Sequence, residues 1–326
     1  MRPFNKRQFL KFGLATGAAL TLAACGGGDD DPAPAAPSST SLDLVEVLGG
    51  RSEYSLLVEA VQTAGLVSIL KGTGPFTVFA PTNAAFSALL SELNITKSAL
   101  FSNTALLTAV LTYHVLPAQV AAADIPFGRA ITSVEGSIFK IDSVSGAPVI
   151  TDGRNRTANI TQTNLFTRNG VIHQIDKVIL PADKDIVATA LALAPEFSLL
   201  VEAVQTAGLV STLQSDGPFT VFAPTNAAFA AALTELGVDK DTLFGDVPLL
   251  TQILTYHVLG LRVLKADVPL NTAITTVEGT TFQVNSSLAI IDAVGRSANI
   301  LNTDVLTSNG VIHVIDKVIL PALPAA

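Results

Sequence analysis

A ten-residue sequence, TVFAPTNAAF, occurs at residues 77–86 and returns unchanged at residues 220–229. Its first half contains aromatic and β-branched residues, which suit the pleated surface of a buried strand. Pro81 predicts the end of that strand because proline has no N–H to donate to a neighbouring strand. Thr82 and Asn83 have side-chain oxygens that can accept from the first N–H groups of a helix. The decamer therefore predicts a buried strand that leads directly into a helix, built twice in one chain.

Two other segments repeat in the same order. The dipeptide Tyr-His at residues 113–114 returns at residues 256–257, and the run that begins at Gly170 returns at Gly310. The period is therefore near 140 residues, whereas the repeats of solenoid proteins are about 20–50 residues long. A period of this length is typical of a duplicated domain.

The duplication divides the folded part of the chain into domain 1, residues 42–181, and domain 2, residues 182–326. In each domain helical patterns come first and short strands follow, which indicates an α+β fold and not an alternating α/β sheet. Asn169-Gly170 lies between the last two strands of domain 1. Asn-Gly is typical of a type I′ hairpin turn, in which both central residues have a positive φ. The linker between the domains is very short, so we expect them to lie close together.

The N-terminus has the pattern of an export signal. Basic residues precede an apolar run at residues 12–24, which is too short to cross a bilayer as a helix. We interpret residues 1–24 as a signal peptide. Residues 25–41, rich in Gly, Asp, Pro, Ala and Ser, predict a flexible tether. Residues 5–11 resemble the twin-arginine export motif with lysine in place of the first arginine, which leaves that route and the general secretory route both open.

The sequence Leu22-Ala23-Ala24-Cys25 resembles a bacterial lipobox, and Cys25 is the single cysteine of the chain. The resemblance implies that Cys25 is acylated and that the lipid anchors the mature N-terminus. Gly26 after the cysteine resembles outer-membrane sorting. We therefore expect a protein that is lipid-anchored in the bacterial envelope, at the outer membrane or cell surface, or secreted. The alternative is an ordinary secretory signal with an incidental cysteine.

Composition excludes several classes of partner. Hydrophobic residues make up 49% of the chain and charged residues 14%, which is ample for packed cores. The formal net charge is -8, so nucleic acid and anionic membrane surfaces repel the chain. We expect no nucleic-acid partner, and membrane contact only through the N-terminal lipid.

The decamer, the Tyr-His pair and the run Gly-Val-Ile-His-x-Ile-Asp-Lys-Val-Ile-Leu-Pro together resemble the fasciclin domain family, twice over. The resemblance covers nearly everything after the tether. It implies two tandem domains, each a seven-stranded β-sandwich or wedge with a helical layer. The family usually has Asp after the Thr of the first motif, where this chain has Asn83 and Asn226. Asparagine keeps the capping oxygen and loses the charge.

The resemblance also implies a function in cell adhesion and extracellular-matrix contact, without enzymatic activity or a cofactor. The expected partner is a protein or polysaccharide of the matrix or envelope, or a second copy of the chain. In animal members the Tyr-His region is implicated in integrin contact. This makes four residues candidate partner contacts here: Tyr113, His114, Tyr256 and His257. The alternative function is a small-ligand carrier or sensor that holds its ligand in a groove beside the Tyr-His helix.

The chain contains four histidines, two in matching positions of each copy: His114, His173, His257 and His313. Histidine is a common metal ligand, but no His-x₃-His spacing occurs, so we interpret them as buried groups that hydrogen-bond the backbone. The strand pattern places His173 on a core-facing side, where the hydroxyl of Thr77 or Thr82 is a plausible partner. Acidic residues recur between the copies, but no spacing brings two together for acid–base catalysis.

Overall fold

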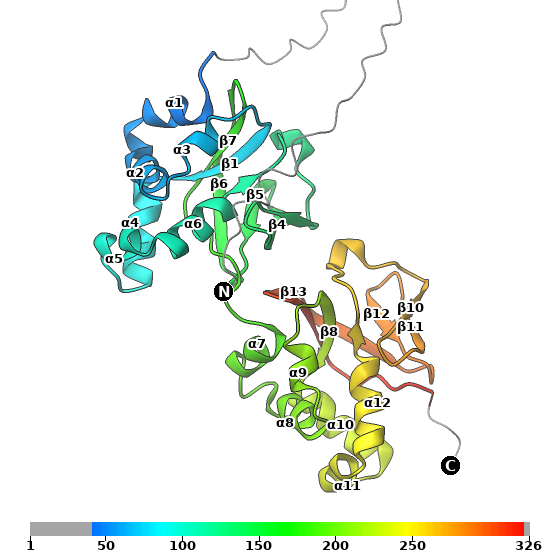
Figure 1. Cartoon of the computed structure of the whole chain (residues 1–326). Helices are drawn as coiled ribbons and strands as arrows, with labels where there is room; N and C mark the ends of the chain where they lie inside the picture. Colours follow the sequence, from blue (N-terminus) through cyan, green and yellow to red (C-terminus); the bar gives the residue numbers. More distant parts are fainter. Residues whose placement is uncertain (1–40, 323–326) are drawn as a thin grey trace, which may run out of the picture.

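A computed structural model describes residues 41–322. The predictions for the signal peptide, for nearly all of the tether and for lipidation at Cys25 fall outside the described residues. The chain forms two domains in succession, each with helices and a sheet (Figure 1). Between residues 41 and 322 no helix is long and apolar enough to cross a membrane.

Domain 1 begins with helices and ends with strands. Its helices are α1 (Leu44–Gly49), η2 (Ser52–Tyr54), α2 (Ser55–Thr63), α3 (Val67–Leu70), α4 (Asn83–Glu92), α5 (Lys97–Ser102), α6 (Thr104–Tyr113) and η3 (Ala122–Asp124). Its strands are β1 (Phe76–Pro81), β2 (Val115–Leu116), β3 (Ala130–Thr132), β4 (Ile138–Val144), β5 (Ala147–Thr151), β6 (Thr157–Thr167) and β7 (Gly170–Ile175). They form one seven-stranded sheet in the order β2-β1-β7-β6-β5-β4-β3. Strands β1 and β7 are parallel, and the other neighbours are antiparallel.

Domain 2 repeats this plan. Its helices are α7 (Ile186–Ala192), α8 (Ser198–Thr206), α9 (Val210–Leu213), α10 (Asn226–Leu236), α11 (Lys240–Gly245), α12 (Val247–Tyr256) and η4 (Lys265–Asp267). Its strands are β8 (Phe219–Pro224), β9 (Val258–Leu259), β10 (Ala273–Thr275), β11 (Thr281–Val284), β12 (Ala289–Ile291), β13 (Ser297–Thr307) and β14 (Gly310–Ile315). The seven-stranded sheet has the order β10-β11-β12-β13-β14-β8-β9. The expected α+β fold is confirmed in both copies.

Each sheet has a buried apolar cluster on either face. In domain 1, Val78 and Ile172 belong to the cluster that they form with apolar residues of the helices. Phe79 and Ile175, which alternate with them along β1 and β7, belong to a second cluster with residues of β3, β4 and β5. Burial on both faces explains why β1 is apolar at every position except Thr77 and does not alternate strictly.

The decamer forms the predicted strand-to-helix corner. Strand β1 ends at Pro81, and the hydroxyl of Thr82 accepts from the N–H of Ala85 at 3.3 Å. The same cap holds at Thr225 in domain 2. This part of the sequence prediction is confirmed.

Asn83, in contrast, does not cap the helix that it begins. Its Oδ1 accepts from the N–H of Leu56 in the first turn of α2, at 2.9 Å. Its Nδ2 donates to the carbonyl of Ser52 at 2.9 Å and to the hydroxyl of Ser55 at 3.0 Å. Asn226 makes the equivalent three contacts in domain 2. An ionised aspartate can accept but cannot donate, so the amide is what allows one side chain to make all three contacts.

The type I′ turn predicted at Asn169-Gly170 is wrong. Thr167 pairs with Gly170 across the hairpin, so the two loop residues are Arg168 and Asn169. Positive φ angles occur elsewhere in the described residues, but not at Arg168, Asn169 or Gly170. Turn geometry therefore does not explain the Asn169-Gly170 dipeptide.

Contacts with the helical layer explain the Asn-Gly dipeptide. Asn169 accepts from the first N–H of α1 at 3.0 Å and donates to the carbonyls of Leu70 and Gly72 at 2.8 and 2.7 Å. At Gly170 a Cβ would lie 2.2 Å from the carbonyl oxygen of Phe76, so only glycine fits. Asn309 and Gly310 make the same kinds of contact in domain 2.

Candidate functional site

The Tyr-His pair lies inside domain 1, at the end of α6. Tyr113 exposes 0% and His114 2% of its surface. The Tyr113 hydroxyl donates to the carbonyl of Ile138 at 2.7 Å and accepts from the N–H of Gly153 at 2.8 Å. It therefore joins the end of α6 to strand β4 and to the turn after β5.

His114 is held in one tautomer by two backbone groups. Its Nε2 accepts from the N–H of Ile179 at 3.1 Å, so the proton lies on Nδ1, which donates to the carbonyl of Val110 at 2.7 Å. Burial lowers the pKa of His114 to about 4, because a charged imidazolium is poorly solvated in the interior. The interpretation of His114 as a buried, hydrogen-bonded group is confirmed.

His173 is also buried, but its predicted hydroxyl partner is wrong. Its Nε2 lies 2.9 Å from the carbonyl of Val120, and its Nδ1 accepts from the N–H of Asn164 at 3.3 Å. The Thr77 hydroxyl instead accepts from the N–H of Val120 at 2.9 Å. His173 thus hydrogen-bonds the carbonyl of Val120, and Thr77 hydrogen-bonds its N–H.

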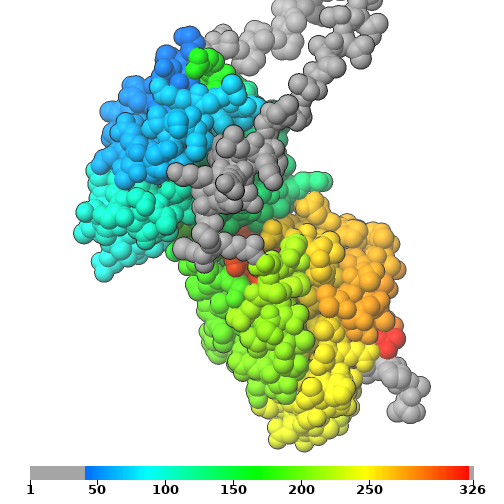
Figure 2. All heavy atoms as spheres, viewed as in Figure 1, coloured from blue at the N-terminus to red at the C-terminus, as the bar shows by residue number. Residues whose placement is uncertain are grey.

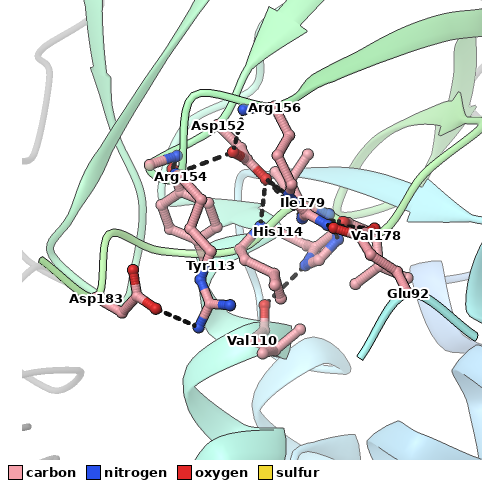
Figure 3. A network of polar contacts seen from close by, with 12 residues as sticks. Glu92, Val110, Tyr113, His114, Asp152, Arg154, Arg156, Val178, Ile179 and Asp183 are labelled. Carbon is pink, nitrogen blue, oxygen red and sulfur yellow. Dashed lines mark hydrogen bonds and ion pairs between the residues drawn. The ribbon is translucent and has the colours of Figure 1, made fainter. Parts of the chain in front are cut away.

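The buried carboxylate of Asp152 connects the turn after β5 to the last residues of domain 1. Asp152 accepts from the backbone N–H groups of Arg154, Arg156 and Leu180 at 2.9 Å each. It also accepts from the Arg156 guanidinium at 2.7 and 3.0 Å. Arg156 continues to the Val178 carbonyl and to Glu92 on α4, both at 2.9 Å (Figure 3).

Domain 2 contains the same network. Tyr256 bridges Thr281 and Ala293, His257 bridges Ile253 and Ile319, and Asp292 binds Arg296 and Leu320. This network was not predicted from the sequence. The available signal was the Asp-x₃-Arg spacing at Asp152 and Arg156, which returns unchanged at Asp292 and Arg296.

These contacts give the Tyr-His pairs a structural role, because they hold the segments 178–180 and 318–320 against the sheet. All four residues predicted as partner contacts, Tyr113, His114, Tyr256 and His257, are at most 2% exposed. Direct contact with a partner stays a prediction, and this burial does not favour it. In residues 41–322 no group of three or more His, Cys, Asp or Glu side chains is placed to hold a metal ion.

The cavity beside the Tyr-His helix is too small for an organic ligand. It has a volume of about 20 Å³ and apolar walls that include Leu57, Val78 and Leu111, with His114 at its edge. This is space for one water molecule. A carrier function therefore needs another site.

A larger cavity, of about 710 Å³, lies where the two domains meet. Its walls come from the turn after β5, from the linker and from domain 2: Gly153, Arg154, Asn155, Asp183, Lys184, Thr189, Ala192, Leu193, Glu196, Phe197, Thr225, Leu301, Asn302, Val305, Leu306 and Val314. We call this cavity the interdomain groove. In Figure 2 domain 1 rests on the yellow and orange surface of domain 2.

Four direct contacts join the domains. The Arg129 guanidinium lies 3.4 Å from the Asp267 carboxylate. Lys140 on β4 donates to Asp304 on β13 at 2.9 Å. The side-chain amide of Asn155 bonds both backbone groups of Leu306, at 2.7 and 3.0 Å. Ile138 of domain 1 shares one buried apolar cluster with residues of domain 2: Leu264, Leu306 and Val311. The domains are therefore in contact, as the short linker predicted.

The groove has an apolar surface that domain 1 lacks at the equivalent place. In domain 1, Tyr54 donates to Gln174 at 2.8 Å, and Gln174 donates to Thr161 at 3.0 Å. The repeat aligns these three polar residues with three apolar ones, all of which line the groove: Phe197, Leu301 and Val314. Leu301 is 60% exposed. Large exposed apolar side chains in a cavity are typical of a ligand site.

Comparison with known proteins finds related domains along most of the chain. The family model described as "Fasciclin domain" matches residues 52–181 and 195–321. A second, described as "TAT (twin-arginine translocation) pathway signal sequence", matches residues 3–23. The chain thus carries a signal for export across the membrane.

Individual relatives include vertebrate and bacterial proteins. The transforming growth factor-beta-induced protein ig-h3 of Oryctolagus cuniculus is 32% identical over 86% of this chain. The chain spans only 39% of that protein's length. Protein sll1483 of Synechocystis sp. is 39% identical over 45% of this chain and 77% of its own length. Among solved structures, a FAS1 domain pair from the insect cell adhesion molecule Fasciclin I aligns with 86% of this chain and 98% of its own, at 19% identity and a TM-score of 0.39.

Proposed function

The chain belongs to the fasciclin domain family, and from this we propose that it is an adhesion protein anchored to the bacterial envelope. Its two domains bind a protein or polysaccharide of the envelope or matrix, or a second copy of the chain. The observation that supports this most strongly is the combination of an export signal with two tandem fasciclin domains. In this proposal the chain is not an enzyme, and adhesion needs no cofactor.

The binding surface lies on exposed parts of the two domains. The Tyr-His side chains are buried, so they support that surface from within and do not form it. The interdomain groove is a concave region with both apolar and charged walls, including Leu193, Leu301, Arg154 and Glu196. We take it as the first region to test.

A pull-down tests this function. The soluble chain that begins after Cys25 is immobilised and incubated with envelope and matrix extracts. We expect it to retain one defined protein or polysaccharide. The control is a chain with Asp152→Ala and Asp292→Ala, which we expect to be unfolded. Equal retention by both chains, or none by either, would contradict the proposal.

The lipid anchor at Cys25 leads to a prediction about localisation. Cys25→Ser removes the thiol that would be acylated, so the protein is expected to move from the membrane fraction to the soluble fraction. The measurement is fractionation followed by immunoblotting. Gly26→Asp, which keeps the cysteine, is expected to stay with the membranes. A Cys25→Ser protein that still sediments with membranes would show that Cys25 is not the anchor.

The interdomain groove favours a second function, the binding of a small apolar molecule. A volume of about 710 Å³ lies within the roughly 300–1,000 Å³ typical of ligand sites. Its apolar residues replace a hydrogen-bonded polar group of domain 1. Phe197 and Val314 also belong to the buried core of domain 2. Leu301 stays largely exposed, so packing within domain 2 does not explain the apolar residue at that position.

Restoring the polar residues of domain 1 tests the carrier function. The triple variant Phe197→Tyr, Leu301→Thr and Val314→Gln is expected to lower the affinity for the dye 1-anilinonaphthalene-8-sulfonate about tenfold or more, because apolar contact area is lost. Fluorescence titration measures this. The matched control, Tyr54→Phe, changes the same position in domain 1 and is expected to have no effect. Dye binding that is absent from the native chain, or equal in the triple variant, would contradict the carrier function.

A further inference from the structure

Most contacts between the domains use residues that the other copy does not have. We propose that the two domains form a closed pair, in which one face of domain 1 recognises one face of domain 2 and neither recognises its own kind. The donor face of domain 1 consists of Arg129, Ile138, Lys140 and Asn155. The acceptor face of domain 2 consists of Leu264, Asp267, Asp304 and Leu306. The partner that each face fits is therefore the other domain of the same chain.

The ion pair at the centre of this interface is shielded from water. The side chains of Lys140 and Asp304 are 12% and 3% exposed. The second oxygen of Asp304 accepts from the N–H of Lys265 at 2.7 Å, which fixes the carboxylate in place. A charge that is buried here without its partner is costly. This arrangement of the domains is therefore favourable only when Lys140 lies opposite Asp304.

Asn155 closes an open edge of the domain 2 sheet. Strand β12 pairs with β13 only at residues 297–299, so it does not cover β13 at Leu306. The amide of Asn155 both donates to and accepts from the Leu306 backbone, as a neighbouring strand would. Asn155 has a φ of 61°, a conformation that asparagine adopts more readily than most residues. Burial of Leu306, which is 2% exposed, makes these two hydrogen bonds necessary.

The second copy has lost the donor face. The repeat aligns Arg129, Ile138, Lys140 and Asn155 with Thr272, Thr281, Gln283 and Gly295. Gly295 has no side chain with which to bond a strand edge, and Gln283 has no charge. A further domain placed against domain 2 in the same way would find neither the cation nor the amide.

The first copy has lost most of the acceptor face in the same manner. The repeat aligns Leu264 with Ala121 and Asp304 with Asn164, whereas Asp267 is retained as Asp124. The Asn164 oxygen accepts from the N–H of Ala122 at 2.8 Å, as Asp304 accepts from Lys265, but the second group of the Asn164 side chain is an NH2 that cannot accept from a lysine. The decamer is identical in both copies, whereas these interface residues differ. The divergence therefore prevents chains from adding head to tail through this contact and leaves one fixed pair.

Two local measurements on the full chain, made soluble by Cys25→Ser, test the closed pair. The variants Lys140→Gln and Asn155→Gly introduce the residues that domain 2 already carries at these positions, so both are compatible with the fold. Asn155→Gly removes the acceptor for the Leu306 N–H, and we expect hydrogen exchange at that amide to accelerate about tenfold or more. The double variant with both Lys140→Gln and Asn155→Gly frees the domains to move relative to each other. We expect the distribution of distances between spin labels at Ser98 and Thr242 to become at least twofold broader.

The matched control places the donor residues on domain 2, as Gln283→Lys and Gly295→Asn. These changes face no acceptor, so exchange at Leu306 and the label distances are expected to stay as in the parent chain. Unchanged Leu306 exchange in Asn155→Gly, or a broad distance distribution in the parent chain, would overturn the proposal. Self-association that Lys140→Gln abolishes would also overturn it, because the donor face would then be in contact with a second chain.

Discussion

Replacing Asp152 with alanine is expected to lower the free energy of unfolding of domain 1 by about 3–5 kcal/mol. The carboxylate is 1% exposed and accepts from three backbone N–H groups and the Arg156 guanidinium. Without it Arg156 keeps a half-buried charge, and the N–H of Leu180 loses its only described acceptor. Groups left unpaired in the interior cost more than the net energy of the bonds that were lost.

Urea denaturation followed by circular dichroism measures this effect. Asp292→Ala is expected to destabilise domain 2 by a similar amount, since Asp292 has the same partners in that domain. Asp183→Ala is the control, because Asp183 forms a partly exposed ion pair with Arg154, and such pairs contribute about 0–1 kcal/mol. If Asp152→Ala cost no more than Asp183→Ala, the buried network would not hold the domain together.

Lowering the pH from 7 towards 4 is expected to destabilise both domains. Burial lowers the pKa of His114 and of His257 to about 4, whereas an unfolded histidine titrates near 6.5. Between these values the unfolded chain binds more protons than the folded chain, so stability falls as the pH falls. Above about pH 6.5 both states are neutral, and stability does not depend on these groups. The difference corresponds to a loss on the order of 3 kcal/mol per histidine by pH 4.

The pH effect is measured from the urea midpoint at intervals between pH 7 and pH 4. His114→Gln is expected to lower stability at pH 7, because glutamine does not reproduce the geometry of both ring contacts. It is also expected to reduce the slope of stability against pH for domain 1, whereas the slope for domain 2 stays. A slope that is the same in His114→Gln and the parent chain would show that another group causes the acid sensitivity.

Contacts that are local in sequence were predictable, and contacts between distant segments were not. The strand, Pro81 and the Thr82 cap follow from neighbouring residues. Asn83 instead accepts from the N–H of Leu56, 27 residues earlier in the chain, and Asn169 binds segments about a hundred residues away. Both asparagines had plausible local roles, a helix cap and a hairpin turn, and these competing explanations led to wrong predictions.

The interdomain groove and the buried network also depend on tertiary structure. The repeat showed that Tyr54 becomes Phe197 and that Thr161 becomes Leu301, but not that these positions face the same cavity. Likewise, the spacing between Asp152 and Arg156 is visible in the sequence, whereas their common contact with residues 178–180 is not. When the residues that differ between the two copies of a domain are mapped onto the structure, they locate such sites without a comparison to other proteins.

The most direct test of adhesion compares cells that carry the intact chain with cells that lack it and with cells that carry Cys25→Ser. Attachment to matrix-coated surfaces under flow is measured at equal cell density. We predict that attachment falls when the chain is absent, and that Cys25→Ser, which releases the protein from the envelope, falls to the same level. Equal attachment by all three strains would contradict an adhesive function.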